Sequence, residues 1–124
     1  MSKILLIEED TAMQMLVREW LSAEGYEVRV PVPGRVAAND EFDRELDLVI
    51  VNVLNLRAQG AAVLKDIQAV YPGSALIGLS TQLGRSLDRD SDVARQLGVS
   101  HLVAKPFSRS ELIDAVVGVI GRAH

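Results

Sequence analysis

The sequence contains no cysteine, no dense basic run and no long apolar run, and each absence excludes a class of protein. Without cysteine, neither a disulfide framework nor a thiolate metal site is possible. The formal net charge of -4 and the scattered Lys and Arg residues disfavour direct nucleic-acid binding, which needs concentrated positive charge. The opening stretch MSKILLIEED has too few apolar residues for a signal peptide or a membrane span. We therefore expect a cytoplasmic protein that contacts neither membrane nor nucleic acid.

The length and composition indicate one globular domain. The chain has 124 residues, of which 48% are hydrophobic and 24% charged, values typical of a folded domain. This length suffices to bury most of the apolar side chains around a single core. We expect residues 1–124 to form one domain, with no repeat, low-complexity tract or linker.

Short apolar runs alternate with amphipathic stretches along the chain. The runs at residues 3–7, 26–30, 47–51, 75–80 and 101–104 predict strands. Apolar residues at helical spacing predict helices after the first, third, fourth and fifth strands, and the segment 33–45 gives only a weak second helix. This alternation predicts a three-layer, doubly wound α/β fold, with a parallel five-stranded sheet covered by helices on both faces.

Polar residues follow four of these strands, at the edge where such sheets place their functional crevice. They are Glu8, Glu9 and Asp10; Asn52; Ser80 and Thr81; and Lys105 before Pro106. Neighbouring carboxylates suit a hard divalent cation such as Mg²⁺. Asp10 is also predicted to cap the first helix, and Ser108-Arg109-Ser110-Glu111 is predicted to form a capping box at the start of the last helix. The convergence of these groups is a stronger signal than any one of them alone.

With these residues in view, the chain resembles the receiver domain of two-component response regulators, a flavodoxin-like, CheY-like fold, over essentially its whole length. The matching features are the acidic cluster in LLIEED, the strand DLVIVN, Gly60 in the loop expected next, Ser80 closing IGLS, and Lys105-Pro106-Phe107 before the last helix. The resemblance implies a signalling module, without enzymatic activity of its own, in two-component or phosphorelay signal transduction.

In that family an aspartate accepts a phosphoryl group from a histidine kinase, with Mg²⁺ held by the acidic pair. By position, Glu8 and Glu9 match the acidic pair and Asn52 matches the acceptor. The resemblance assigns the phosphoryl contacts to Ser80, with Thr81 beside it, and to Lys105. It also implies that a kinase or an output protein docks on the face formed by the fourth helix, the fifth strand and the fifth helix, and it leaves a homodimer through this face open.

Asn52 is the main departure from the family pattern. An aspartyl phosphate requires a carboxylate nucleophile, whereas a neutral amide oxygen is a poor nucleophile and the amide nitrogen is a donor. The amide also removes a negative charge from the cation site. We expect no required cofactor, and at most weak Mg²⁺ coordination by Glu8, Glu9 and the main chain near Leu54.

Lys105 lacks the acceptor's negative charge, which raises the question of its partner. A buried, unpaired lysine would be costly. One hypothesis is that Lys105 pairs with Glu9, whose extra methylene lengthens its reach, or hydrogen-bonds the side-chain oxygen of Asn52. The alternative is that Lys105 extends into solvent. Three residues earlier, Leu102 stands at the family's aromatic switch position, where we expect it only to pack.

Two loops also depart from the family. Leu56 stands where a proline is usual, and we expect a flexible loop there. The segment TQLGRSLDRDSD, residues 81–92, is longer than usual and predicts a mobile loop, either solvated or contacting a partner, before a short fourth helix. His101 and His124 are expected to be structural or exposed, because no catalytic constellation surrounds them.

The sequence thus predicts an atypical receiver, or pseudo-receiver, which is not phosphorylated at Asn52 and acts by docking a protein partner. One alternative is a regulator phosphorylated on another acid, such as Glu8, Glu9 or Asp10. A second is a flavodoxin-like binder of a small ligand, which the acidic, glycine-free turn EEDTAM disfavours because it would repel phosphate.

Overall fold

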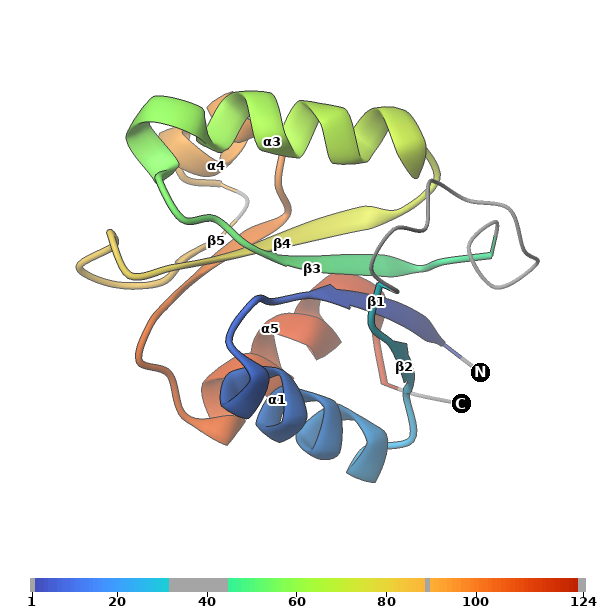
Figure 1. Cartoon of the computed structure of the whole chain (residues 1–124). Helices are drawn as coiled ribbons and strands as arrows, with labels where there is room; N and C mark the ends of the chain where they lie inside the picture. The colour runs from blue at the N-terminus through green and yellow to red at the C-terminus, as the bar shows by residue number, and fades with distance from the viewer. Residues whose placement is uncertain (1, 32–44, 89, 123–124) are drawn as a thin grey trace.

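One sheet lies between two layers of helices in the computed structural model, which describes residues 2–31, 45–88 and 90–122 (Figure 1). The sheet has six strands in the order β2-β1-β3-β4-β6-β5. In chain order these are β1 (Lys3–Ile7), β2 (Glu27–Arg29), β3 (Leu48–Asn52), β4 (Ala75–Ser80), β5 (Leu87–Asp88) and β6 (His101–Ala104). All five predicted strands are present and pair in parallel, which confirms the fold class.

Four helices of the described part of the chain cover the two faces of the sheet. They are α1 (Thr11–Ala23), α3 (Leu56–Val70), α4 (Asp92–Leu97) and α5 (Arg109–Ile120). Helices α3 and α4 lie on one face, and α1 and α5 lie on the other (Figure 1). The weak second helix was expected in the segment 33–45, nearly all of which falls outside the described residues. None of the helices described is long and apolar enough to cross a membrane.

The alternation of side chains along the strands divides the core into two clusters. On β1, Ile4 and Leu6 belong to the cluster that packs against α1 and α5, whereas Leu5 belongs to the cluster beneath α3 and α4. On β6, Val103 belongs to the first cluster and Leu102 to the second. Because both faces of the central strands are buried, their sequences are almost continuously apolar.

Local capping sets the ends of three of the helices. The Asp10 side chain accepts a hydrogen bond from the backbone N–H of Met13 at 3.1 Å, which confirms its predicted role as the N-cap of α1. Ser108 and Glu111 form the predicted capping box at the start of α5. Helix α4 ends at Gly98, whose φ of 72° is the left-handed conformation that favours glycine.

Two predictions about loops were wrong in part. The segment expected to be a mobile loop contains β5, where Leu87 pairs with Leu102 and Asp88 with His101 in antiparallel register, so the sheet gains a sixth strand at its edge. The loop expected after β3 is short because α3 begins at Leu56, and this helix includes Gly60. A two-residue strand depends on tertiary pairing more than on local composition, so β5 was not visible in the sequence.

Candidate functional site

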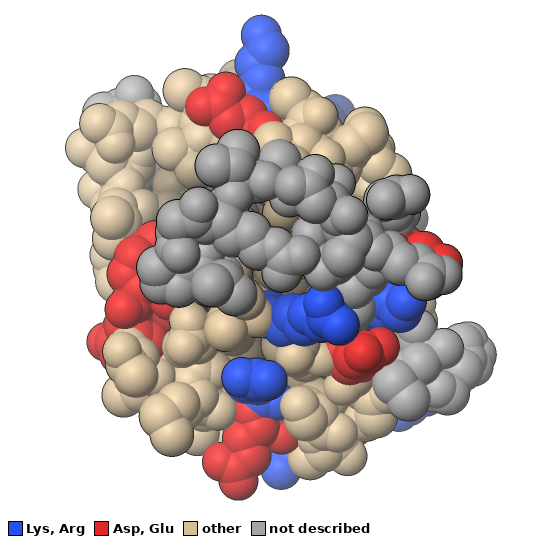
Figure 2. Space-filling model, turned by 45° about the vertical axis from the view of Figure 1, so that its right-hand side comes forward, with Lys and Arg blue, Asp and Glu red and all other residues tan. Residues whose placement is uncertain are grey.

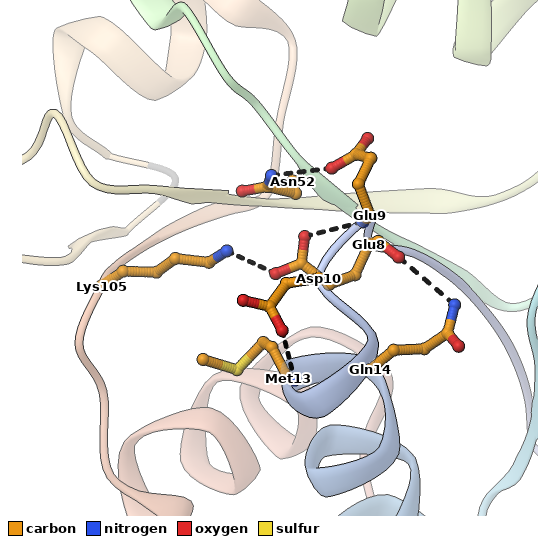
Figure 3. A network of polar contacts seen from close by, with 7 residues as sticks. All are labelled: Glu8, Glu9, Asp10, Met13, Gln14, Asn52 and Lys105. Atoms are coloured by element: carbon orange, nitrogen blue, oxygen red, sulfur yellow. Dashed lines mark hydrogen bonds and ion pairs between the residues drawn. The ribbon is translucent and has the colours of Figure 1, made fainter.

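The functional edge of the sheet brings together side chains from β1, β3, β4 and β6 or from the loops that follow them. Figure 3 shows Glu8 and Glu9 after β1, Asn52 at the end of β3 and Lys105 after β6 close together, and we call this group of side chains the pocket. On the β4 side, the backbone N–H of Lys105 donates to the carbonyl of Ser80 at 2.9 Å. The structure thus places four of the predicted residues together, and Ser80 is hydrogen-bonded to one of them, Lys105, through the main chain.

Glu8 and Lys105 form the buried ion pair of the pocket. The Lys105 Nζ donates to Glu8 Oε1 at 2.5 Å, and the second carboxylate oxygen of Glu8 accepts the backbone N–H of Glu9 at 3.1 Å. The Glu8 side chain is fully buried, and that of Lys105 is 13% exposed. Since a buried carboxylate is costly without a partner, the ammonium of Lys105 and this backbone donor together account for its stability in the pocket.

Asn52 contacts the second acid of the pair. Its Nδ2 donates to Glu9 Oε2 at 2.9 Å, and Glu9 itself is exposed (Figure 3). An amide nitrogen directed at a carboxylate is a hydrogen-bond donor and has no nucleophilic oxygen to offer in that direction. The position that would accept a phosphoryl group in the family pattern is therefore used as a donor.

Both expectations for Lys105, the pairing hypothesis and the solvent-exposed alternative, were wrong. Lys105 pairs with Glu8 instead of Glu9 or the Asn52 oxygen, and it does not extend into solvent. Glu9 uses its length to reach Asn52 instead. The parity of the strands carried a signal for this arrangement: Glu8 lies two residues after Leu6, and Lys105 lies two residues after Val103. Both apolar residues face α1 and α5, so the two charged residues start toward the same side.

Ser80 and Thr81 differ sharply in their surroundings. Ser80 is fully buried, and its Oγ accepts the backbone N–H of Gln82 at 3.0 Å. Thr81 is exposed. The Ser80 hydroxyl therefore holds the turn that follows β4 in this structure, and the sequence had not singled out Gln82.

Gln14 is a further residue of the pocket wall that the sequence reasoning missed. From α1, its Nε2 donates to the main-chain carbonyl of Glu8 at 3.2 Å (Figure 3). Helical periodicity places it one turn beyond Asp10, so a position four residues after the predicted N-cap was the available signal. The contact ties the first turns of α1 to the strand end that carries the acidic pair.

Leu102, at the family's aromatic switch position, is fully buried and packs as expected. Its side chain lies over Gly78 of the neighbouring strand β4, where an added Cβ would come within 2.8 Å of Leu102 Cδ2. The absence of a side chain at Gly78 therefore makes room for Leu102. Such packing fixes the position of the leucine side chain. No polar group is present at this position to form or break a hydrogen bond when the pocket changes.

The contacts of the acidic pair decide whether it fits a divalent cation. Mg²⁺ requires oxygen ligands in near-ideal octahedral geometry, and it keeps several waters. In this structure both oxygens of Glu8 already accept hydrogen bonds and one oxygen of Glu9 accepts the Asn52 amide. Over the described residues, no group of three or more His, Cys, Asp or Glu residues is arranged to hold a metal ion. The residues in this arrangement do not fit Mg²⁺.

Comparison with known proteins identifies the class to which this fold and pocket belong. A model of the response regulator receiver domain matches residues 4–117, nearly the whole chain. The chain belongs to the family of response regulator receiver domains of two-component systems.

Among curated proteins, the chain is similar to the transcriptional regulatory protein CpxR of Escherichia coli K12, with 30% identity over 124 residues, covering 100% of this chain and 51% of CpxR. The chain thus spans about half the length of the curated relatives it matches. Among solved structures, it is similar to the response regulator TrrA of Thermotoga maritima in complex with Mg²⁺ and BeF, at 25% identity and a TM-score of 0.69, covering 96% of this chain and 99% of TrrA.

A second solved structure is the receiver domain of the sensor histidine kinase PA1611 from Pseudomonas aeruginosa PAO1, which has a magnesium ion coordinated in its active-site cleft. The identity is 25% and the TM-score 0.69, covering 97% of this chain and 98% of that domain. These likenesses agree with the layer order and the parallel sheet described above.

Proposed function

We propose that this chain is a pseudo-receiver, which takes no phosphoryl group at the usual position and acts in signal transduction by docking a protein partner. The observation that carries the proposal is the contact of Asn52 with Glu9: the Nδ2 donates to Oε2 at 2.9 Å. A phosphoryl acceptor must present a carboxylate oxygen to the donor, and this residue presents an N–H. The proposal includes no enzymatic activity and no required cofactor.

The ion pair of Lys105 supports the same proposal. In the family pattern a lysine at this position contacts phosphoryl oxygens, but here its ammonium is bound to the buried carboxylate of Glu8. Engaging a phosphoryl group would require breaking that pair and leaving the Glu8 carboxylate without its counterion. The pocket is thus stabilised in a form that has no need of phosphorylation.

Phosphorylation of another acid receives little support from the contacts. Both carboxylate oxygens of Glu8 are engaged, and Asp10 caps α1. Glu9 is exposed, but it accepts a hydrogen bond from Asn52. Each alternative acceptor would have to give up a contact that holds the pocket or the helix together.

We assign partner docking to the face formed by α4, β6 and α5, where a histidine kinase, an output protein or a second copy would bind. Between α5 and the sheet edge lies a groove of about 480 Å³, whose lining includes Asp88, His101, Glu111, Asp114 and Val119. Burial lowers the pKa of His101, and the nearby Asp88 carboxylate partly opposes this shift. Because β5 pairs with the edge of β6, a partner would dock on side chains here and would not extend the sheet at β6.

We infer no direct binding to nucleic acid or to a membrane surface. On the side of the molecule seen in Figure 2, basic and acidic side chains are interspersed over the residues that are not grey. Phosphate backbones and anionic lipids select concentrated positive charge, and the net charge of the chain is -4. A mixed surface with a negative balance favours a protein partner.

The test is intact-mass spectrometry after incubation with acetyl phosphate and Mg²⁺, comparing the wild type with Asn52→Asp. We expect no added phosphoryl mass on the wild type and a phosphoryl mass on Asn52→Asp, since this change supplies the missing carboxylate. Asn55→Asp is the matched control, because it adds the same charge three residues away. A phosphoryl mass on the wild type would overturn the proposal. A mass on both Asp variants would show that the added charge, and not its position, is responsible.

A further inference from the structure

Two donors meet the two carboxylates of the acidic pair, one donor for each acid. The ammonium of Lys105 lies on Glu8 Oε1 at 2.5 Å, and the amide of Asn52 lies on Glu9 Oε2 at 2.9 Å. Figure 3 shows Glu8 directed to Lys105 and Glu9 directed to Asn52. The positive charge of Lys105 therefore occupies the side of Glu8 that faces the pocket. The amide dipole of Asn52 occupies the corresponding side of Glu9.

The arrangement has consequences for a divalent cation. For Glu8 to ligate a metal, Lys105 would have to leave a carboxylate whose side chain is fully buried, while its own side chain is only 13% exposed. For Glu9 to ligate with the oxygen that faces the pocket, the Asn52 amide would have to turn away. Each displacement would leave a donor without its acceptor. The free energy lost in this way exceeds what two carboxylate ligands would gain by binding the metal.

We propose that Lys105 and Asn52 together take the place of a divalent cation in this pocket, so that the protein takes up no Mg²⁺ there, and that the amide of Asn52 decides this. The inference rests on the proposed function because it concerns the same pocket. The proposed function states that the pocket accepts no phosphoryl group, and the inference adds that it takes up no metal. The pocket balances one carboxylate with an ammonium and hydrogen-bonds the other to an amide, and its structure does not depend on the supply of metal.

The charge balance explains why Asn52 is decisive. With an amide at this position, the pocket holds two carboxylates and one ammonium, and the amide donates to the carboxylate that lacks an ammonium. Replacing Asn52 by Asp would put a carboxylate, in place of a donor, at hydrogen-bonding distance from the carboxylate of Glu9. Two like charges so close repel strongly, and a bound cation relieves the repulsion. The pocket would then demand the metal that it now excludes.

The experiment uses the whole chain and Mn²⁺ alone as the probe, because the spectrum of free Mn²⁺ in electron paramagnetic resonance reports the bound fraction directly. We expect only weak, nonspecific binding, away from the pocket, to the wild type and to the charge-matched control Asn55→Asp. Asn52→Asp should bind at least about tenfold more tightly than either, and Mg²⁺ should displace the ion. Circular dichroism checks that each variant is folded.

A second variant keeps the inference testable if Asn52→Asp fails to fold. Lys105→Met removes the ammonium from Glu8 and leaves Asn52 in place, so we expect Mn²⁺ affinity above that of the wild type but below that of Asn52→Asp. The single tryptophan, Trp20, gives a second readout, because its ring lies 6.4 Å from that of Phe107, two residues after Lys105. Its fluorescence should respond to Mg²⁺ only in the variants that bind the ion.

The outcomes separate this inference from the proposed function. Wild-type affinity for Mn²⁺ equal to that of Asn52→Asp would overturn the inference, even if the wild type takes no phosphoryl group. Equal gains in Asn52→Asp and Asn55→Asp would also overturn it, because general negative charge would then explain the binding. A wild type that gains phosphoryl mass but binds Mn²⁺ weakly would instead contradict the proposed function alone.

Discussion

Glu8 and Glu9 are neighbours in the sequence with the same side chain, yet the structure gives them different surroundings. Glu8 is 5% exposed and pairs with an ammonium, whereas Glu9 is exposed and pairs with an amide. The same chemical group is thus a buried counterion at one position and a surface hydrogen-bond acceptor at the next. The family's acidic pair has therefore separated here into a structural acid and a peripheral one.

The largest expected effect is that of Glu8→Gln. The change leaves the ammonium of Lys105 facing a neutral amide in a site where both side chains are largely buried. Removing one partner of a buried ion pair costs about 3 kcal/mol or more, and we expect a loss near about 3 kcal/mol in the free energy of unfolding. Urea denaturation followed by circular dichroism measures it. A loss below about 1 kcal/mol would show that the ion pair does not hold the pocket.

Lys105→Met should have the next largest effect. The Glu8 carboxylate loses its counterion but keeps the backbone N–H of Glu9, so we expect a loss of about 2 kcal/mol in the free energy of unfolding. The double variant with Glu8→Gln isolates the interaction. If the two residues act on each other, the double variant should be more stable than the sum of the single losses predicts, by about 1 kcal/mol or more. Simple additivity would contradict the pairing.

The smallest effect is expected for Glu9→Gln, which is chemically the same change as Glu8→Gln at the next position. Glu9 is exposed, and glutamine keeps an oxygen that can accept the Asn52 amide. We expect the free energy of unfolding to change by no more than about 0.5 kcal/mol. Identical urea denaturation of the two glutamine variants gives the direct comparison. Equal losses at both positions would remove the distinction between the two acids.

Much of the fold could be predicted from local patterns. The apolar runs placed all five parallel strands, and Asp10 and Ser108 were recognised as caps because a capping side chain bonds to the backbone only a few residues away. The edge strand β5 escaped prediction, since Leu87 and Asp88 form a strand only by pairing with Leu102 and His101. Two residues carry no periodicity that could mark a strand.

The order of residues along the chain is enough to show which residues stand at the functional edge of the sheet and that the central one, Asn52, is an amide. Which acid each donor contacts depends on the three-dimensional arrangement. Glu8 and Lys105 are 97 residues apart, and the strands that they follow, β1 and β6, are separated in the sheet by β3 and β4. Periodicity and capping depend on neighbours along the chain, whereas this ion pair depends on the strand order and on the reach of a lysine across the pocket.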